Sequence, residues 1–228
     1  GAITTQNRAA LATLSGGIAA KVSAKRMAEI QEKGRAESDH TFNGSVQLEF
    51  TGSAGQGFAV FQTEGMNVKL WGEANDSVCK AMSGGLTVIN PSVESRFKPP
   101  ENAIIGNCAL YGATGGTLYV HGIAGDRFAV RNSGATAVVE GTGLHPCEYM
   151  TNGTVVILGS IAGNAGAGMT GGILYLRKDE LHQINREYVT PLDPAEEDAV
   201  NLYGIISDYY KETGSETART YMENWETE

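Results

Sequence analysis

Glycines recur along this chain at a nearly constant step, each just ahead of a short run of β-branched or aliphatic residues. The steps between them are 20, 31, 18, 19 and 19 residues. These marker glycines are Gly65, Gly85, Gly116, Gly134, Gly153 and Gly172. A period near 19 that is built from strand and tight turn, without room for a helix, is typical of a β-solenoid. Because one such coil cannot bury its own apolar face, we expect the coils to stack.

The pattern predicts one domain with an all-β core: a right-handed, single-stranded parallel β-helix of about 19 residues per coil, with short helices at both ends. The β-helix is predicted over 45–177, between a helical N-terminal segment (1–44) and a helical C-terminal segment (178–228). Tight corners need positive φ and little side-chain volume, which explains the 30 glycines. For both reasons we expect Gly134→Val to destabilise the fold strongly.

Each coil is also expected to carry a second, weaker strand, because short apolar runs such as Phe58–Phe61 and Phe128–Val130 recur once per period. In the N-terminal segment, Gly16 and Gly17 are expected to divide a helical pattern into two short helices. Six apolar residues there are predicted to be buried: Leu11, Leu14, Ile18, Val22, Met27 and Ile30.

Near the C-terminus, the sequence predicts a short helix over 178–187, followed by two more. One begins at Asp193-Pro194 and is closed by Gly214, and the other covers 215–225. We expect these helices to cover the open edge of the last coil, as solenoid ends require.

The 31-residue step contains an insertion at Asn90–Asn102, which holds three of the six prolines. Such an insertion is expected to project from the stack as a loop. Loops on rigid scaffolds often carry contacts, and they are equally often tolerated additions without a role. The sequence leaves both interpretations open.

Composition narrows the class of partner. The net charge is −9, which disfavours a nucleic-acid groove or an anionic membrane surface. No apolar run reaches the ~20 residues that a membrane span needs. Cys79, Cys108 and Cys147 lack CxxC spacing, so we interpret them as buried, reduced thiols of a cytoplasmic protein. They are not expected to bind an Fe–S cluster or a structural zinc ion.

Two glycine triplets invite a nucleotide-binding interpretation: Gly52, Gly55, Gly57 and Gly163, Gly166, Gly168. The dinucleotide motif needs a helix directly after the glycines, and β-type sequence follows both triplets here. Corner glycines are therefore the preferred interpretation.

Other chemically active residues are weighed in the same way. The histidines His40, His121, His145 and His182 lack the spacing of metal ligands, although His121 and His145 could approach each other. Ser133 has no identifiable base. Cys147 could act as a nucleophile beside His145, but a structural thiol is favoured. We assign no catalytic, cofactor-binding or metal-binding residue to the chain.

Several polar residues fall in or beside the expected corners, where side chains stacked between coils can satisfy backbone groups. They are Asn75, Asp76, Asn107, Arg127, Arg131, Asn132, Glu140 and Glu148. A structural role is the default interpretation for all of them, with Arg131 pairing to Glu140 or Glu148 between coils.

A series of ordered strings runs through the chain: GEAND (72–76), KAMSGG (80–85), IIGN (104–107), LYGATG (110–115), GDRFAVRNSG (125–134), VVEG (138–141) and CEYM (147–150). Together these strings resemble the C-terminal domain of the glutamate synthase large subunit, a right-handed β-helix described by its GxGxG repeat. The resemblance extends to both ends of the chain. It implies a non-catalytic structural unit between catalytic ones, and it carries over no catalytic residue.

The resemblance also implies partners. In that family an amidotransferase domain and a barrel domain with FMN and an Fe–S cluster make glutamate from 2-oxoglutarate, and neither fits within 228 residues. We therefore expect both on separate amidotransferase and synthase chains, and neither cofactor on this chain. Alternatives are an independent solenoid binding module and the equivalent subunit of N-methylglutamate synthase or formylmethanofuran dehydrogenase. Self-association is left open.

Overall fold

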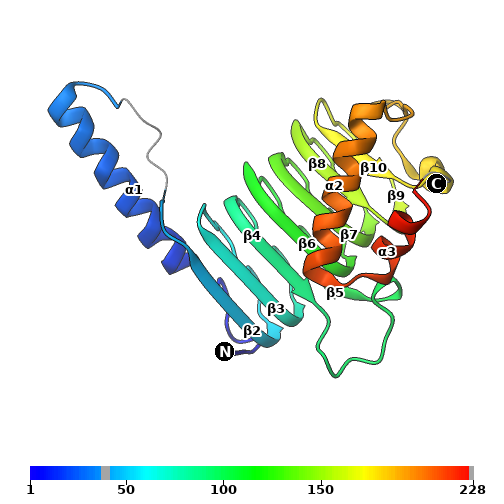
Figure 1. Ribbon diagram of the computed structural model, residues 1–228, viewed down its shortest axis with the longest axis horizontal. Coiled ribbons are helices and arrows are strands. Elements are labelled where there is room, and N and C mark those ends of the chain that lie inside the picture. Colours follow the sequence, from blue (N-terminus) through cyan, green and yellow to red (C-terminus); the bar gives the residue numbers. More distant parts are fainter. Residues whose placement is uncertain (37–41, 226–228) are drawn as a thin grey trace.

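A computed structural model describes residues 1–36 and 42–225. His40, and the part of the predicted N-terminal segment over 37–41, lie outside the described residues. The described chain forms a parallel β-solenoid whose main strands follow one another in the order β1-β2-β3-β4-β6-β7-β8-β10 (Figure 1). Successive strands pair in parallel register, for example from Asn67 opposite Leu86 to Trp71 opposite Asn90. This confirms the predicted fold class.

The strands are β1 (Ala2–Ile3), β2 (Val46–Ala54), β3 (Met66–Ala74), β4 (Ser83–Asn90), β5 (Ala103–Ile105), β6 (Gly115–Ala124), β7 (Ser133–Leu144), β8 (Asn152–Ile157), β9 (Ile161–Gly163) and β10 (Ile173–Leu176). The helices are α1 (Ala12–Lys33), α2 (Glu196–Thr213) and α3 (Glu216–Glu223), with 3₁₀ turns η1 (Pro99–Glu101) and η2 (Lys178–Gln183). None of the helices in the described ranges is long and apolar enough to cross a membrane.

Inward-pointing side chains of the strands fill the solenoid interior, and the alternation is clearest on β2 and β3. On β3, Met66, Val68 and Leu70 are buried while the residues between them are partly exposed. Stacking such strands at the ~4.8 Å spacing of neighbouring strands puts equivalent side chains on top of one another. One continuous core results, with Phe58, Phe128 and Met150 among its fully buried members.

The predicted second strands are wrong. Residues 56–61 and 126–131 form turns in which every second residue has a left-handed backbone, such as Ala59 at φ 56° and Ala129 at φ 57°. We call these segments the turn arcs: 57–61, 77–81, 108–112, 127–131, 145–149 and 164–168. They curve so tightly that two adjacent side chains, such as Phe128 and Ala129, both point into the core. The apolar runs that suggest a strand in the sequence are therefore buried within turn arcs and not within strands.

Hydrogen bonds between coils maintain the turn arcs. The Cys79 N–H donates to the Phe58 carbonyl at 2.9 Å, and the Cys147 N–H donates to the Phe128 carbonyl at 2.8 Å. Left-handed backbone costs a residue other than glycine roughly 1–2 kcal/mol. The fold accepts this cost because each strained residue sits in a ladder that satisfies its buried backbone.

Five of the six marker glycines have φ between 81° and 91°, as expected. Gly134 is the exception, because the residue that aligns with Gly116 across the β6–β7 register is Ala135. Gly134 is instead required by contact: a Cβ there would lie 2.4 Å from the Thr114 carbonyl oxygen. The expected destabilisation by Gly134→Val therefore stands on sterics and not on φ.

The N-terminal helix differs from the prediction. α1 is one continuous helix of 22 residues that passes through Gly16 and Gly17, whose surroundings are open. Two glycines cost a helix only ~1 kcal/mol each relative to alanine, which the packing of the first turns offsets. Ile18 is buried there, but Met27 is 56% exposed, contrary to expectation. Beyond its first turns, α1 extends away from the solenoid (Figure 1).

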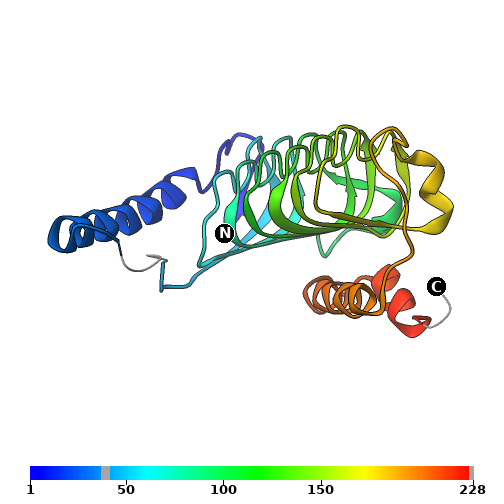
Figure 2. The same ribbon diagram turned by 90° about the horizontal axis from the view of Figure 1, so that it is seen from above.

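The C-terminal helices form where predicted but cover a different surface. Figure 2 shows α2 and α3 against the broad outer face of the sheet, not across the edge of the last coil. There Ile206 and Tyr209 of α2 pack on Val88, Tyr119 and Val138, a second apolar cluster outside the solenoid. The segment after β10 meets the last coil instead, where Ile184 bridges to Ala165. The helix predicted over 178–187 is the shorter 3₁₀ turn η2.

Candidate functional surfaces

The thiols considered as nucleophiles lie in the core. Cys147 and Cys79 are fully buried within turn arcs, and burial raises the pKa of each thiol from 9.0 to about 12. A thiol with so high a pKa is not ionised at neutral pH and is a poor nucleophile. Cys108 is half-buried, so the expectation of burial holds fully for two of the three.

Ser133 and the histidines are likewise placed in structural contacts. The Ser133 hydroxyl donates to the Ala113 carbonyl at 3.2 Å. His145 lies 3.0 Å from a Glu148 carboxylate oxygen and 2.9 Å from the Asn164 amide. His121 faces the outer side of the sheet, where desolvation lowers its pKa and the nearby Glu140 charge opposes that shift. Within the described part of the chain, no hydrogen bond or ion pair joins His121 to His145.

Both glycine triplets line solenoid corners. Gly57, Gly163, Gly166 and Gly168 all have positive φ, and the segments after them are a turn arc and strand β10. A phosphate site of the dinucleotide type needs the N-terminus of a helix at this point. The structure therefore supports the corner interpretation of these glycines.

A ladder of polar side chains runs along the corner before the turn arcs. The Asp76 Oδ1 accepts the Asn107 N–H, the Asn107 Oδ1 accepts the Asp126 N–H, and the Asp126 Oδ1 accepts the Leu144 N–H, all at 2.8 Å. His145, Asn164 and Asn185 continue the ladder through side-chain hydrogen bonds. This confirms that Asn side chains satisfy backbone groups between coils.

Asp126 was not among the predicted corner residues. A signal for it exists, because Asn107, Asp126, His145 and Asn164 follow one another at steps of 19 residues. The polar residue recurs with the coil period, but its type varies, and this hides the repeat from a search for one residue. Position and hydrogen-bonding capacity are what the ladder requires.

Glu140 lies elsewhere than expected. It is buried on the outer face of the sheet, where its Oε1 accepts hydrogen bonds from Tyr209 at 2.8 Å and from Ser215 at 2.5 Å. The predicted pairing with Arg131 is therefore wrong for Glu140. Glu148 pairs with His145, and Arg131 only donates its backbone N–H to the Glu148 carbonyl among the contacts of the described residues. Sequence gave no sign that Tyr209 and Ser215 would reach Glu140.

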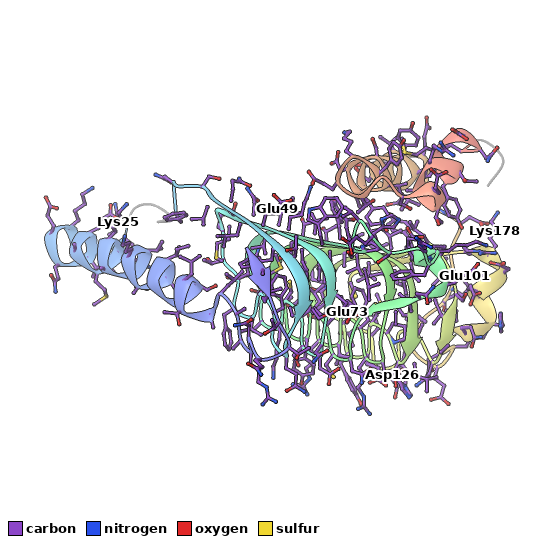
Figure 3. All side chains as sticks on the ribbon, turned by 90° about the horizontal axis from the view of Figure 1, so that it is seen from below. Lys25, Glu49, Glu73, Glu101, Asp126 and Lys178 are labelled. Atoms are coloured by element: carbon purple, nitrogen blue, oxygen red, sulfur yellow. The ribbon has the colours of Figure 1, made fainter. Side chains whose placement is uncertain are left out.

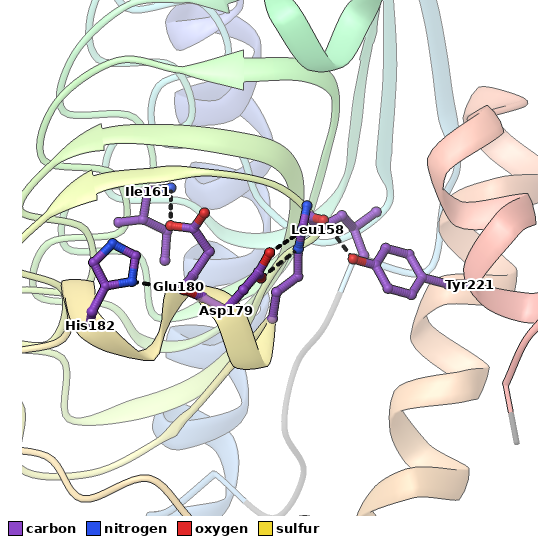
Figure 4. A network of polar contacts seen from close by, with 7 residues as sticks. Leu158, Ile161, Asp179, Glu180, His182 and Tyr221 are labelled. Carbon is purple, nitrogen blue, oxygen red and sulfur yellow. Dashed lines mark hydrogen bonds and ion pairs between the residues drawn. The ribbon is translucent and has the colours of Figure 1, made fainter. Parts of the chain in front are cut away.

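A second set of polar contacts joins η2 and α3 to the last coils (Figure 4). The Tyr221 hydroxyl donates to the Leu158 carbonyl at 3.0 Å, and the Ile161 N–H donates to Glu180 at 3.1 Å. Arg177 forms an ion pair with Asp179 beside them. These contacts join the helical end to the solenoid, and within the described ranges no cluster of three or more metal-binding side chains accompanies them.

The insertion projects as predicted. Trp71 of β3 pairs with Asn90, and Ala74 of β3 pairs with Ile105. Only two residues separate Trp71 from Ala74, whereas the whole insertion lies between Asn90 and Ile105. It leaves the sheet and returns through η1 (Figure 1). Val93 and Phe97 on it are 82% and 41% exposed. The insertion therefore exposes two large apolar side chains on an otherwise regular surface.

Comparison with known proteins identifies the relatives of this arrangement. The family model described as "GXGXG motif" matches residues 2–228. A ferredoxin-dependent glutamate synthase from Arabidopsis thaliana is 49% identical over 197 residues, covering 82% of this chain. Ferredoxin-dependent glutamate synthase 2 from Synechocystis is 48% identical over 81% of this chain, and the NADH glutamate synthase from Schizosaccharomyces pombe is 50% identical over 76%.

The chain spans only 12% of the first two relatives and 8% of the third. The relatives therefore match this chain over one part of a much larger protein. The family model, which spans residues 2–228, includes the coils, corner glycines and polar ladder described above. The family model matches nearly the whole chain, and the relatives are 48–50% identical to it. The chain belongs to the GXGXG-motif family and is a β-solenoid domain of the glutamate synthase type.

Proposed function

We propose that this chain is a non-catalytic structural unit of a glutamate-synthase-type complex. In that complex glutamine amide nitrogen passes to 2-oxoglutarate to give glutamate, and this unit holds the amidotransferase and synthase units in fixed relation. The observation that carries the proposal is the polar ladder from Asp76 to Asn185. It ties successive coils together and favours a rigid body, which is what positioning two distant active sites requires.

The chemistry of the side chains supports a role without catalysis. The obvious nucleophile, Cys147, is held in the core, and Ser133 is bonded to backbone. The iron atoms of an Fe–S cluster are held mainly by Cys thiolates that converge on one site. Cys79 and Cys147 do not fit that requirement, because their side chains fill the apolar core. We propose that FMN and the Fe–S cluster are bound by the synthase partner.

Mild affinity purification of the tagged chain from its host tests the proposal. We expect amidotransferase-like and synthase-like chains by mass spectrometry, with flavin and Fe–S absorbance in the eluate. Cys147→Ala is the matched control, and it should recover the same chains with unchanged glutamate synthesis. A colourless chain recovered alone would overturn the proposal, and loss of synthesis in a folded Cys147→Ala complex would overturn the non-catalytic role.

The insertion is the first surface to examine in that complex. Replacing 92–98 with a short Gly-Ser link leaves the strands on both sides intact and removes Val93 and Phe97. We expect this variant to keep its thermal stability but to recover less of one partner chain. Equal recovery of all partners would show that the loop is a tolerated addition.

A further inference from the structure

The distal half of α1, residues 23–33, extends away from the coils of the solenoid (Figure 1). The first turns are anchored, since Ile18 is buried and the Ser15 hydroxyl contacts the Met66 sulfur at 3.5 Å. Past its first turns the helix extends outward from the first coil in both views (Figures 1 and 2). Helices of this length draw most of their stability from tertiary packing. An extended segment with exposed Met27 therefore has the character of a docking element.

This segment is basic within an acidic protein. Residues 21–35 contain five Lys and Arg residues against two Glu residues, whereas the whole chain has a net charge of −9. Lys21, Lys25 and Arg26 form no salt bridge with another residue in the parts of the chain that the structure describes. Figure 3 shows Lys25 on the projecting helix, away from the labelled acidic side chains of the solenoid.

The C-terminal segment that contains α2 is acidic, opposite in charge to the distal half of α1. Residues 193–225 contain eight Asp and Glu residues against two Lys and Arg residues. Glu196, Val200 and Tyr203 share one face of α2 at the i, i+4, i+7 spacing. Val200 is 67% exposed and Tyr203 is 38% exposed, so this face presents apolar surface beside carboxylates. Glu196 and Glu197 have no salt bridge within 1–36 and 42–225.

We propose that the occupant of each surface is a second copy of this chain. The distal half of α1 from one copy packs on the outward face of α2 in the other, and the exchange is reciprocal. Met27 then meets Val200 and Tyr203, while Lys25 and Arg26 face Glu196 and Glu197. Two identical contacts of this kind close a two-fold dimer. Both complementary surfaces belong to this chain, so the dimer needs no catalytic partner and is independent of the proposed function.

Light scattering after size exclusion, on the purified chain alone, is the first test. We expect a dimer whose dissociation constant weakens at least tenfold between low and high salt, because the facing charges are screened. A monomer at every concentration up to ~100 μM would overturn the proposal, because the dissociation constant would then be weaker than that value.

Charge reversal then identifies the surfaces. The variants K25E/R26E and E196K/E197K should each be monomeric alone, because each places like charges across both contacts. An equimolar mixture should restore the dimer, since every contact again joins opposite charges. Matched controls are R96E/K98E and E94K/E101K on the insertion, which make the same charge changes and should leave the dimer intact.

The pattern of outcomes is decisive. Dimerisation of E196K/E197K alone would place α1 against some surface other than α2 and overturn the proposal. Failure of the mixture to reassemble, with both variants folded by circular dichroism, would do the same. If the dimer forms in the mixture but with neither variant alone, then α1 of one copy contacts α2 of the other.

Discussion

The Tyr209 hydroxyl of α2 lies 2.8 Å from the Glu140 carboxyl oxygen on β7, and both side chains are buried. Ser215, at the start of α3, donates to the same Oε1. The other oxygen of Glu140 has no hydrogen-bond partner among the described residues. The carboxyl group therefore depends on two hydroxyls from the C-terminal helices, which fixes where those helices sit on the sheet.

Removal of one of those hydroxyls should be costly. We expect Tyr209→Phe to lower the free energy of unfolding by about 1–3 kcal/mol, because a buried acceptor loses a donor. Urea denaturation followed by circular dichroism measures the change. Tyr210→Phe, one residue along and only half-buried, should stay within ~0.5 kcal/mol of the parent. Equal midpoints for the two variants would contradict the importance of the contact.

The sequence predicted the coils, but not the backbone between the strands. The repeat period and the apolar pattern indicate which residues are buried. Both are the same whether the backbone between the main strands is a strand or a turn arc. Left-handed φ at Phe61, Cys79 or Arg131 carries no compositional signal, because these residues adopt it only when neighbouring coils provide hydrogen bonds. The same reason hid the Glu140–Tyr209 contact, which joins residues 69 positions apart in sequence.

The buried thiols predict how stability depends on pH. Cys79 and Cys147 hold their protons more tightly in the folded chain, with pKa about 12 against 9.0 when exposed. Their contribution is fully present below pH 9 and declines as the pH rises toward 12. Each thiol should add a slope of about 1.4 kcal/mol per pH unit in that window. Denaturation of Cys147→Ala from pH 8 to 10.5 should show a shallower decline, and parallel curves would contradict this.

Two glycines distinguish a position that is glycine because of its positive φ from one that is glycine because a side chain would not fit. Gly112 has φ 63° with open space around it, and Ala81 and Arg131 adopt a similar φ in their turn arcs. Gly112→Ala should therefore cost no more than ~1–2 kcal/mol. Gly134→Val should cost more, at or above the ~3 kcal/mol upper range of overpacking, because its Cβ would clash with the Thr114 carbonyl. Differential scanning calorimetry of both variants checks the order, which a lower Tm for Gly112→Ala would reverse.

The polar ladder requires an acceptor and not a particular residue. Asn107 uses its Oδ1 to accept the Asp126 N–H, while Asp76 and Asp126 do the same with carboxylates. Asn107→Asp should therefore retain the parent's stability, and Asn107→Ala should lose about 1 kcal/mol, as expected for one lost hydrogen bond. Amide hydrogen exchange gives a local readout: the Asp126 N–H should exchange faster in Asn107→Ala and unchanged in Asn107→Asp. If both variants exchange at the parent's rate, the coils are held together without this ladder, and the rigidity assigned to it has another source.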